Sequence, residues 1–425
     1  MYKSEIKDYN LDLYIPNFTS ELVGYSAIAF VCLVTLIISV MWKDISKIIW
    51  AALSVRLIFL LVGHYFVHLP DSTNDALGFE AGAWMMAQNG FINTLENFPG
   101  LNSFFYSWII SIPYSLFGRS ILMMQSIGLL FGLGSVFLGW YVAKKLWDFD
   151  TSIKVGWILA LFPSLVLYSV LPLREVYSSF FILLAISGIV GWVKNNSYTS
   201  IILAFIGFLG AFLFHGALII GFMIFGTILL LNSSKVFLNS LKKLRLNQKS
   251  LVILIVTFVL LGAFYSNKIK VQYIQSFEIS AKMGTIKDTI LVRLKGDASY
   301  SNWTQINSLT EISYKIPVRV AYFLFSPFPW NVSKPNHLFG LCDSLMYMAL
   351  IYLIICNRKS IWQNPALRII FIILLAYLIV YSIGVSNFGA GIRHRSKFVI
   401  GLILLAGPLI PKLILSKKKL IKSFK

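Results

Sequence analysis

Apolar runs close to the length of a membrane crossing recur along this chain, and they constrain its fold more than any other feature. A helix needs about 20 mostly apolar residues to cross the hydrocarbon core of a bilayer. The chain has 425 residues, of which 57% are hydrophobic and only 13% are charged. This balance is typical of a polytopic membrane protein and excludes a soluble one. We therefore predict an all-α fold, a bundle of membrane helices.

Eleven stretches fit a crossing, and two shorter apolar pieces do not. The eleven are Leu22–Met41, Ile48–Val67, Ile121–Ala143, Ile153–Val170, Val176–Val193, Thr199–Phe214, Ala217–Leu231, Leu251–Tyr265, Leu341–Cys356, Leu367–Gly384 and Phe398–Leu415. The pieces at 81–91 and 102–118 are too short or too interrupted. We expect one or two interfacial or re-entrant helices there, because protein can cover their backbone. The prediction is about 11 transmembrane spans plus these helices.

The basic residues indicate which loops face the cytoplasm. The formal charge is +20, and Lys and Arg cluster beside apolar runs, notably in Lys235–Lys249 and in the Lys417–Lys425 tail. Basic loops stay on the cytoplasmic side and meet anionic lipid there, so topology explains the charge and no nucleic acid partner is expected. With Lys43 and Lys47 inside, the loop after the second span faces out. A multi-pass protein of the bacterial inner membrane fits this pattern.

The same reasoning divides the chain into five parts. We expect an outer N-terminal segment, a transmembrane bundle whose acidic first outer loop is 68–118, an outer hydrophilic insertion with a Pro/Trp loop, C-terminal spans and a basic cytoplasmic tail. Their bounds are 1–21, 22–265, 266–338, 339–416 and 417–425.

The first outer loop is unusually acidic for so basic a chain. Asp71, Asp75 and Glu80 follow the second span, and residues 69–118 contain no Lys or Arg. Asp71 and Asp75 are four residues apart, so on a helical turn they share a face and could hold a metal ion or a sugar hydroxyl. Alternatively, Asp75 caps a helix that begins near Ala76. We expect this loop to form one wall of an active site on the outer face.

Three further polar groups fall on the same predicted side as Asp71. They are Arg174 with Glu175, His215, and the run Arg393, His394 and Arg395. A charge at the mouth of a membrane bundle indicates function, because hydrocarbon penalises it unless it is paired. The run at 393–395 is suited to clamp an anion, but it could also place its arginines at the interface. The other two groups could instead be a helix-anchoring ion pair and a packing histidine.

Several short motifs resemble the GT-C superfamily of integral membrane glycosyltransferases. They are the Asp-bearing loop after an early span, the YSLFG turn at 114–118, the KKLW linker at 144–147, the ALFPSLVLYSVLPLRE segment at 160–175 and an arginine-bearing loop before the last spans. The likeness covers roughly residues 50–230 and the loop at 386–397. No nucleotide-binding loop or HExxH motif appears, which argues against a motor-driven pump or a zinc protease.

The resemblance implies transfer of a sugar from a polyprenyl-phosphate donor to a glycan or lipid acceptor. It places the acidic catalytic residue at Asp71 or Asp75. We expect Arg174, Arg393 and Arg395 to hold the donor phosphate and His215 or His394 to donate a proton. Glu80 and Glu175 would support them, and a requirement for Mg²⁺ or Mn²⁺ stays open. The chain departs from the family in having the extra Glu80 and only a small hydrophilic insertion.

Two other functions fit parts of the pattern. An O-antigen polymerase type of enzyme also has about a dozen spans and arginine-bearing outer loops, and it joins lipid-pyrophosphate-linked units. A transporter of lipid-linked sugars would carry charges deep within its spans, whereas here we expect them at span ends. Trp303 and Trp330 could stack on sugar rings or anchor the chain at the interface.

Overall fold

A computed structural model describes residues 15–242, 248–265, 298–306 and 309–412. In this part of the chain the regular elements are helices, apart from one isolated bridge between Ser299 and Asn387, which confirms the all-α prediction. Much of the predicted N-terminal segment, residues 266–297 and 307–308 of the predicted insertion, and the basic tail lie outside the described residues.

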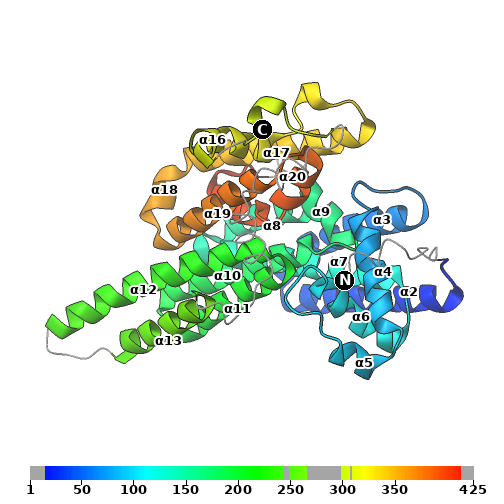
Figure 1. The fold of residues 1–425 in the computed structure, drawn as a ribbon, viewed down its shortest axis with the longest axis horizontal. Helices are drawn as coiled ribbons and strands as arrows, with labels where there is room; N and C mark the ends of the chain where they lie inside the picture. The colour runs from blue at the N-terminus through cyan, green and yellow to red at the C-terminus, as the bar shows by residue number, and fades with distance from the viewer. Residues whose placement is uncertain (1–14, 243–247, 266–297, 307–308, 413–425) are drawn as a thin grey trace, which may run out of the picture.

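The α-helices follow one another through the chain as Figure 1 shows. They are α2 (Phe18–Met41), α3 (Ser46–Tyr65), α4 (Asp75–Ala87), α5 (Phe91–Glu96), α6 (Phe105–Phe117), α7 (Ile121–Leu146), α8 (Phe149–Leu161), α9 (Pro163–Val170), α10 (Glu175–Asn195), α11 (Tyr198–Phe214), α12 (Ile219–Lys242), α13 (Gln248–Tyr265), α16 (Leu309–Phe325), α17 (Pro335–Cys356), α18 (Arg358–Gln363), α19 (Pro365–Gly384), α20 (Phe388–Arg395) and α21 (Val399–Ala406).

Short polar side chains mark where several helices begin. Asn17, Ser120, Asp148, Asn364 and Asn387 each precede a helix and accept a hydrogen bond from a backbone N–H of its first turn. The first N–H groups of a helix have no partner within it, so such a cap fixes the starting residue.

Within the described residues, seven helical segments are long and apolar enough to cross a membrane, namely α2, α3, α7, α10, α12, α17 and α19. The bent pair α8 and α9 makes an eighth when it is counted as one span. The chain thus has the organisation of a multi-pass membrane protein, but the expected count of about eleven is not confirmed. The other three expected spans coincide with α11, α13 and α21, and α11 and α21 are among the shorter apolar helices.

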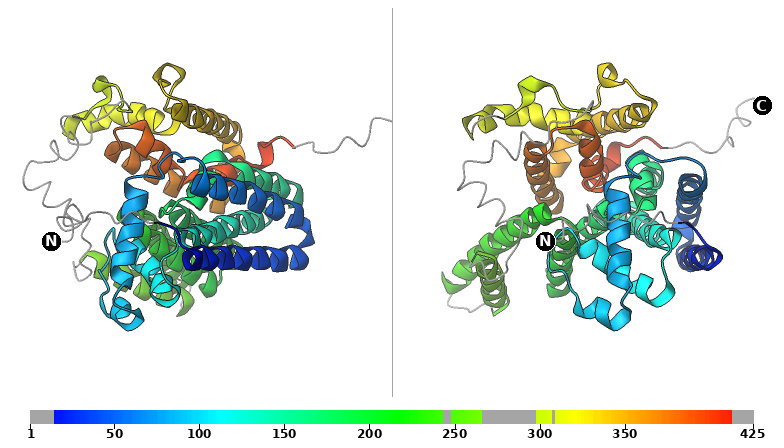
Figure 2. Two further views of the ribbon diagram at one scale, coloured as in Figure 1. Left: turned by 90° about the vertical axis from the view of Figure 1, so that its right-hand side faces the viewer. Right: turned by 45° about the vertical axis from the view of Figure 1, so that its right-hand side comes forward.

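The basic linkers meet at one end of the bundle, which we call the basic end. Lys144 lies 3.6 Å from Asp44 in the linker between α2 and α3. Lys194 at the end of α10 donates to the backbone carbonyl of Lys145. In Figure 1, α18 and the far ends of α12 and α13 lie on the left, and α4, α5 and α6 lie on the right. The right-hand view of Figure 2 also shows α12 and α13 projecting from the bundle.

The first outer loop forms a compact helical unit at the other end, which we call the loop end. Its three helices α4, α5 and α6 are at most 13 residues long and too short to cross, as expected for interfacial helices. A cluster of buried apolar side chains, among them Tyr106 of α6, Met124 of α7 and Tyr177 of α10, packs this unit onto the bundle. An ion pair between Glu80 and Arg119 adds to it.

Two predicted segments need correction. The predicted span Ile153–Val170 is broken at Phe162, because Pro163 supplies no N–H, and its halves are bent by 54°. The helix expected over Ala217–Leu231 continues to Lys242.

The region predicted as an outer insertion with a Pro/Trp loop contains α16. Phe323 and Leu324 of this helix are buried, and Arg319 donates a hydrogen bond to a backbone carbonyl near the end of α19.

Candidate functional site

Side chains from four separate parts of the chain meet at the loop end of the bundle. Asp71 comes from the loop after α3, and Tyr168 comes from α9. Glu175 begins α10, whereas Arg393 and Lys397 lie on and just after α20. We refer to these residues and their direct partners as the candidate site. Most of these side chains lie at or near helix ends, so the candidate site forms where helices begin and end.

Asp71 is held by a single hydroxyl. The phenol of Tyr168 donates a hydrogen bond of 2.7 Å to its Oδ2. Burial of its carboxyl raises the pKa of Asp71 above its usual range, and the Tyr168 bond and the charge of Arg393 only partly oppose that effect. Its backbone has a φ of +62°, a left-handed conformation that non-glycine residues seldom adopt. The site thus presents a carboxylate of enhanced basicity.

Arg393 lies between two carboxylates. Its Nε donates to Oε1 of Glu175 at 2.8 Å, and its Nη1 donates to Oδ2 of Asp75 at 2.6 Å. Burial lowers the pKa of Arg393, but the two carboxylates outweigh it and raise that pKa. The two partners differ in exposure, since the Glu175 side chain is fully buried while that of Asp75 is 66% exposed. An incoming anion could therefore displace Asp75 much more easily than Glu175.

Lys397 is a buried cation that the sequence analysis did not single out. Its Nζ lies 3.4 Å from Oε1 of Glu175 and 2.7 Å from Nδ1 of His394. Burial lowers the pKa of Lys397 from 10.5 to about 7, although the charge of Glu175 opposes the shift. A cation that titrates near neutral pH therefore sits beside Arg393. The sequence signal that could have identified Lys397 is its position three residues after His394, a spacing at which two side chains on a helix share a face.

The two predicted proton donors lie together, but both are held uncharged. The rings of His215 and His394 are 5.3 Å apart in an edge-to-face arrangement. Tyr381 forms a 2.6 Å hydrogen bond to Nδ1 of His215. Burial and the charge of Lys397 keep the pKa of both histidines well below the usual value. These histidines therefore do not suit the expected role of proton donor, whereas protonated Lys397 does.

Arg174 offers hydrogen-bond donors next to this network. Its guanidinium lies over the ring of Phe79 at 5.2 Å, and its Nε has no hydrogen-bond partner among the described residues. It directly precedes Glu175, and its charge lowers the pKa of Lys397. An arginine with uncommitted donors beside other cations is suited to bind phosphate oxygens.

Two predicted site residues have structural partners instead. Arg395 is fully buried, and its guanidinium binds Asp343 and the backbone carbonyls of Leu324 and Ser326. It anchors α20 and has no free face for phosphate, so its expected role is corrected. Glu80 accepts two hydrogen bonds from Arg119, at 2.9 and 2.8 Å, and joins α4 to the start of α7.

Asp71 and Asp75 do not converge on a common point. Asp71 is bound to Tyr168, and Asp75 is bound to Arg393. Among the described residues no group of three His, Cys, Asp or Glu side chains could hold a metal ion. These residues therefore do not fit a Mg²⁺ or Mn²⁺ site.

Exposed aromatic side chains lie in the part of the chain between Glu175 and Arg393. Trp330 is 76% exposed and stacks on Phe328 at 4.9 Å, and Trp303 is 61% exposed and packs edge-on against Tyr322. Such faces suit either a sugar ring or the membrane interface. Stacking on sugar rings and anchoring at the membrane interface therefore both stay predictions for these two tryptophans.

The chain was compared with protein-family models, with curated proteins and with solved structures, and none of these comparisons found a match.

Proposed function

We propose that this chain is a membrane glycosyltransferase that transfers a sugar from a polyprenyl-phosphate-linked donor to a glycan or lipid acceptor on the outer face of the bacterial inner membrane. The observation that carries the proposal is the pairing of one desolvated carboxylate, Asp71, with cations held around Glu175. A hydroxyl that must lose a proton and a phosphate that must leave require this combination of groups.

In the proposed reaction, Asp71 takes the proton of the acceptor hydroxyl while the acceptor oxygen forms a bond to the anomeric carbon. The bond between that carbon and the donor phosphate oxygen breaks, and its electron pair leaves with the phosphate. Arg174, Arg393 and Lys397 stabilise the charge that develops on the phosphate. Protonated Lys397 can return a proton to the leaving oxygen.

Asp75 has a different role in this scheme. Before the donor binds, its exposed carboxylate accepts a hydrogen bond from Nη1 of Arg393. A phosphate oxygen replaces it there, while buried Glu175 keeps the guanidinium in place. Asp75 therefore competes with the donor and does not act as the base.

The test is sugar transfer in liposomes with two donors, a polyprenyl-monophosphate monosaccharide and a polyprenyl-pyrophosphate oligosaccharide. We expect Asp71→Asn to lower kcat for the monosaccharide donor by about 10²- to 10⁴-fold, the usual loss for a general base. Arg393→Ala is expected to raise the donor KM about tenfold or more, because a charged hydrogen bond is lost.

The isosteric change Asp75→Asn serves as the comparison for Asp71→Asn. It is expected to keep kcat within about tenfold, because Asp75 transfers no proton. Equal losses in both variants would contradict the assignment of Asp71 as the base. Chain lengthening of the oligosaccharide that survives Asp71→Asn but not Arg393→Ala would identify a polymerase, and turnover of neither donor would favour a transporter.

A further inference from the structure

A buried arginine lies within a membrane span, and its hydrogen-bond partners among the described residues are backbone carbonyls. Arg56 is near the middle of α3, and only 1% of the residue is exposed. The sequence analysis expected charges at span ends, so this position is a correction. A charge placed there is costly unless it is paired or bonded, and it indicates function.

The partners of Arg56 are backbone carbonyls at the break between α8 and α9. Its Nη1 donates to Ala160 at 2.7 Å, and its Nη2 donates to Leu159 at 3.2 Å. In an unbroken helix the Leu159 carbonyl would accept from residue 163, which is proline and has no N–H. The Ala160 carbonyl would accept from Ser164. The arginine thus supplies donors to the two carbonyls that the break leaves free.

The break also leaves the backbone N–H of Ser164 without a helical acceptor, and Asp343 on α17 supplies one. The backbone N–H of Ser164 donates to Oδ1 of Asp343 at 3.3 Å, and Asp343 also accepts from Arg395 at 2.9 Å. Arg395 ends α20, the helix that carries Arg393. The break is therefore bonded both to α3 and to the helix that presents the site cations.

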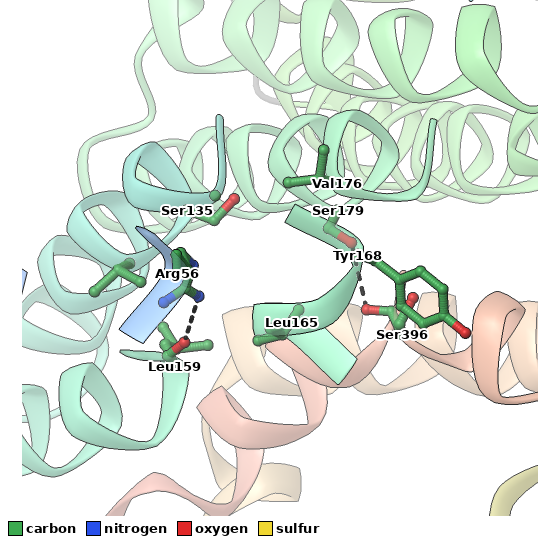
Figure 3. A pocket seen from close by; sticks show the side chains of 10 residues that line it. Arg56, Ser135, Leu159, Leu165, Tyr168, Val176, Ser179 and Ser396 are labelled. Carbon is green, nitrogen blue, oxygen red and sulfur yellow. Dashed lines mark hydrogen bonds between the residues drawn. The ribbon is translucent and has the colours of Figure 1, made fainter. Parts of the chain in front are cut away.

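Close packing as well as hydrogen bonds holds this region. A cavity of about 10 Å³ lies between α3, α7, α9 and α10, and Arg56, Leu165, Tyr168 and Ser396 line it (Figure 3). The α7 and α9 backbones come close at Gly132, where a Cβ would lie 2.6 Å from the Ser169 Cβ.

We infer that Arg56 is a positioning residue: by binding the carbonyls freed at the break, it sets the angle of α9 and so the place of the Tyr168 hydroxyl against Asp71. Tyr168 lies on α9, about one and a half helical turns after Pro163. A change in the angle of α9 at the break therefore moves the Tyr168 hydroxyl. The consequence for sugar transfer rests on the proposed function, but the effect on α9 does not.

The first experiment measures hydrogen–deuterium exchange in the full-length protein in detergent, comparing wild type, Arg56→Met and Arg56→Lys. We expect exchange in segment 163–170 to become at least about tenfold faster in Arg56→Met, because two hydrogen-bonded carbonyls lose their donors. Arg56→Lys should recover part of the protection, since it keeps a cation with three donors.

Arg319→Met is the matched control. Arg319 is equally buried and donates to the carbonyls of Ser382, Ile383 and Val385 at the end of α19. Its loss should speed exchange near residues 382–385 and leave 163–170 unchanged. If Arg56→Met does not fold, Arg56→Lys against wild type provides the same comparison.

The second readout is the acid limb of the pH profile of transfer. Without the Tyr168 bond, the Asp71 anion is less stable, so both Arg56→Met and Tyr168→Phe should move the acid limb up by about one pH unit. Unchanged exchange in 163–170, or an acid limb that moves only in Tyr168→Phe, would overturn the inference. Faster exchange in Arg56→Met, together with a wild type that transfers no sugar from either donor, would instead retain the effect on α9 and reject the proposed function.

Discussion

At the scale of single residues, protonation decides what the candidate site can bind. Asp71 must be charged to accept a proton, and burial raises its pKa. Lys397 must be charged to bind phosphate, and burial lowers its pKa to about 7. Desolvation thus raises the pKa of the Asp71 carboxyl and lowers the pKa of the Lys397 amine. It therefore narrows the pH range in which both groups are charged.

We expect donor binding to weaken as pH rises through about 7, because Lys397 is a cation below its pKa and neutral above it. The measurement is the donor KM between about pH 6 and 8. The change Lys397→Arg should flatten this dependence, since a guanidinium stays charged throughout. A KM in wild type that is constant with pH would show that Lys397 does not contact the donor.

At the scale of elements, α4 carries Asp75 and is fixed at its middle by one ion pair. The side chain of Glu80 is 3% exposed, and Arg119 holds both of its oxygens. The guanidinium of Arg119 also lies 5.8 Å from the ring of Trp84, one turn further along α4. The interfacial unit is therefore fastened to the bundle by charge as well as by apolar packing.

Replacing Glu80 with Gln should destabilise the protein by about 3 kcal/mol, because a largely buried Arg119 loses its charged partner. Thermal denaturation in detergent measures the effect. The matched control is Asp150→Asn, which breaks the exposed pair with Lys412 and should leave the midpoint unchanged. Equal midpoints for Glu80→Gln and wild type would show that apolar packing alone holds α4.

At the scale of the whole molecule, the bundle has two chemically different ends. The basic end joins Lys144, Lys194 and the loop around Arg358, and the loop end carries α4, α5, α6 and the candidate site. The positive-inside rule predicts that the basic end faces the cytoplasm.

The prediction is that the two ends label from opposite sides of the membrane. In a variant without the three native cysteines, Asn97→Cys between α5 and α6 should react with an impermeant maleimide in intact spheroplasts. Lys359→Cys in α18 should react only after permeabilisation. The reverse pattern would place the candidate site in the cytoplasm and exclude a donor presented on the outer face.

The sequence predicted what hydropathy and charge determine, and it missed what three-dimensional proximity determines. The all-α class and the short helices after Asp71 followed from run length. The meeting of Arg393 with Asp75 and Glu175 did not, because those residues are hundreds of positions apart. Arg395 was predicted together with Arg393, yet residues two positions apart on a helix face different neighbours, and Arg395 donates to Asp343.

The candidate site takes Asp71 and Glu175 from the first half of the chain and Arg393 and Lys397 from a much later part. During synthesis, the ribosome releases Asp71 and Glu175 into the membrane long before α20 exists. Before α20 is in place, Glu175 lacks Arg393 and Lys397, the two cations that this segment supplies. Under the proposed function, the growing polypeptide would therefore transfer no sugar until α20 has been inserted.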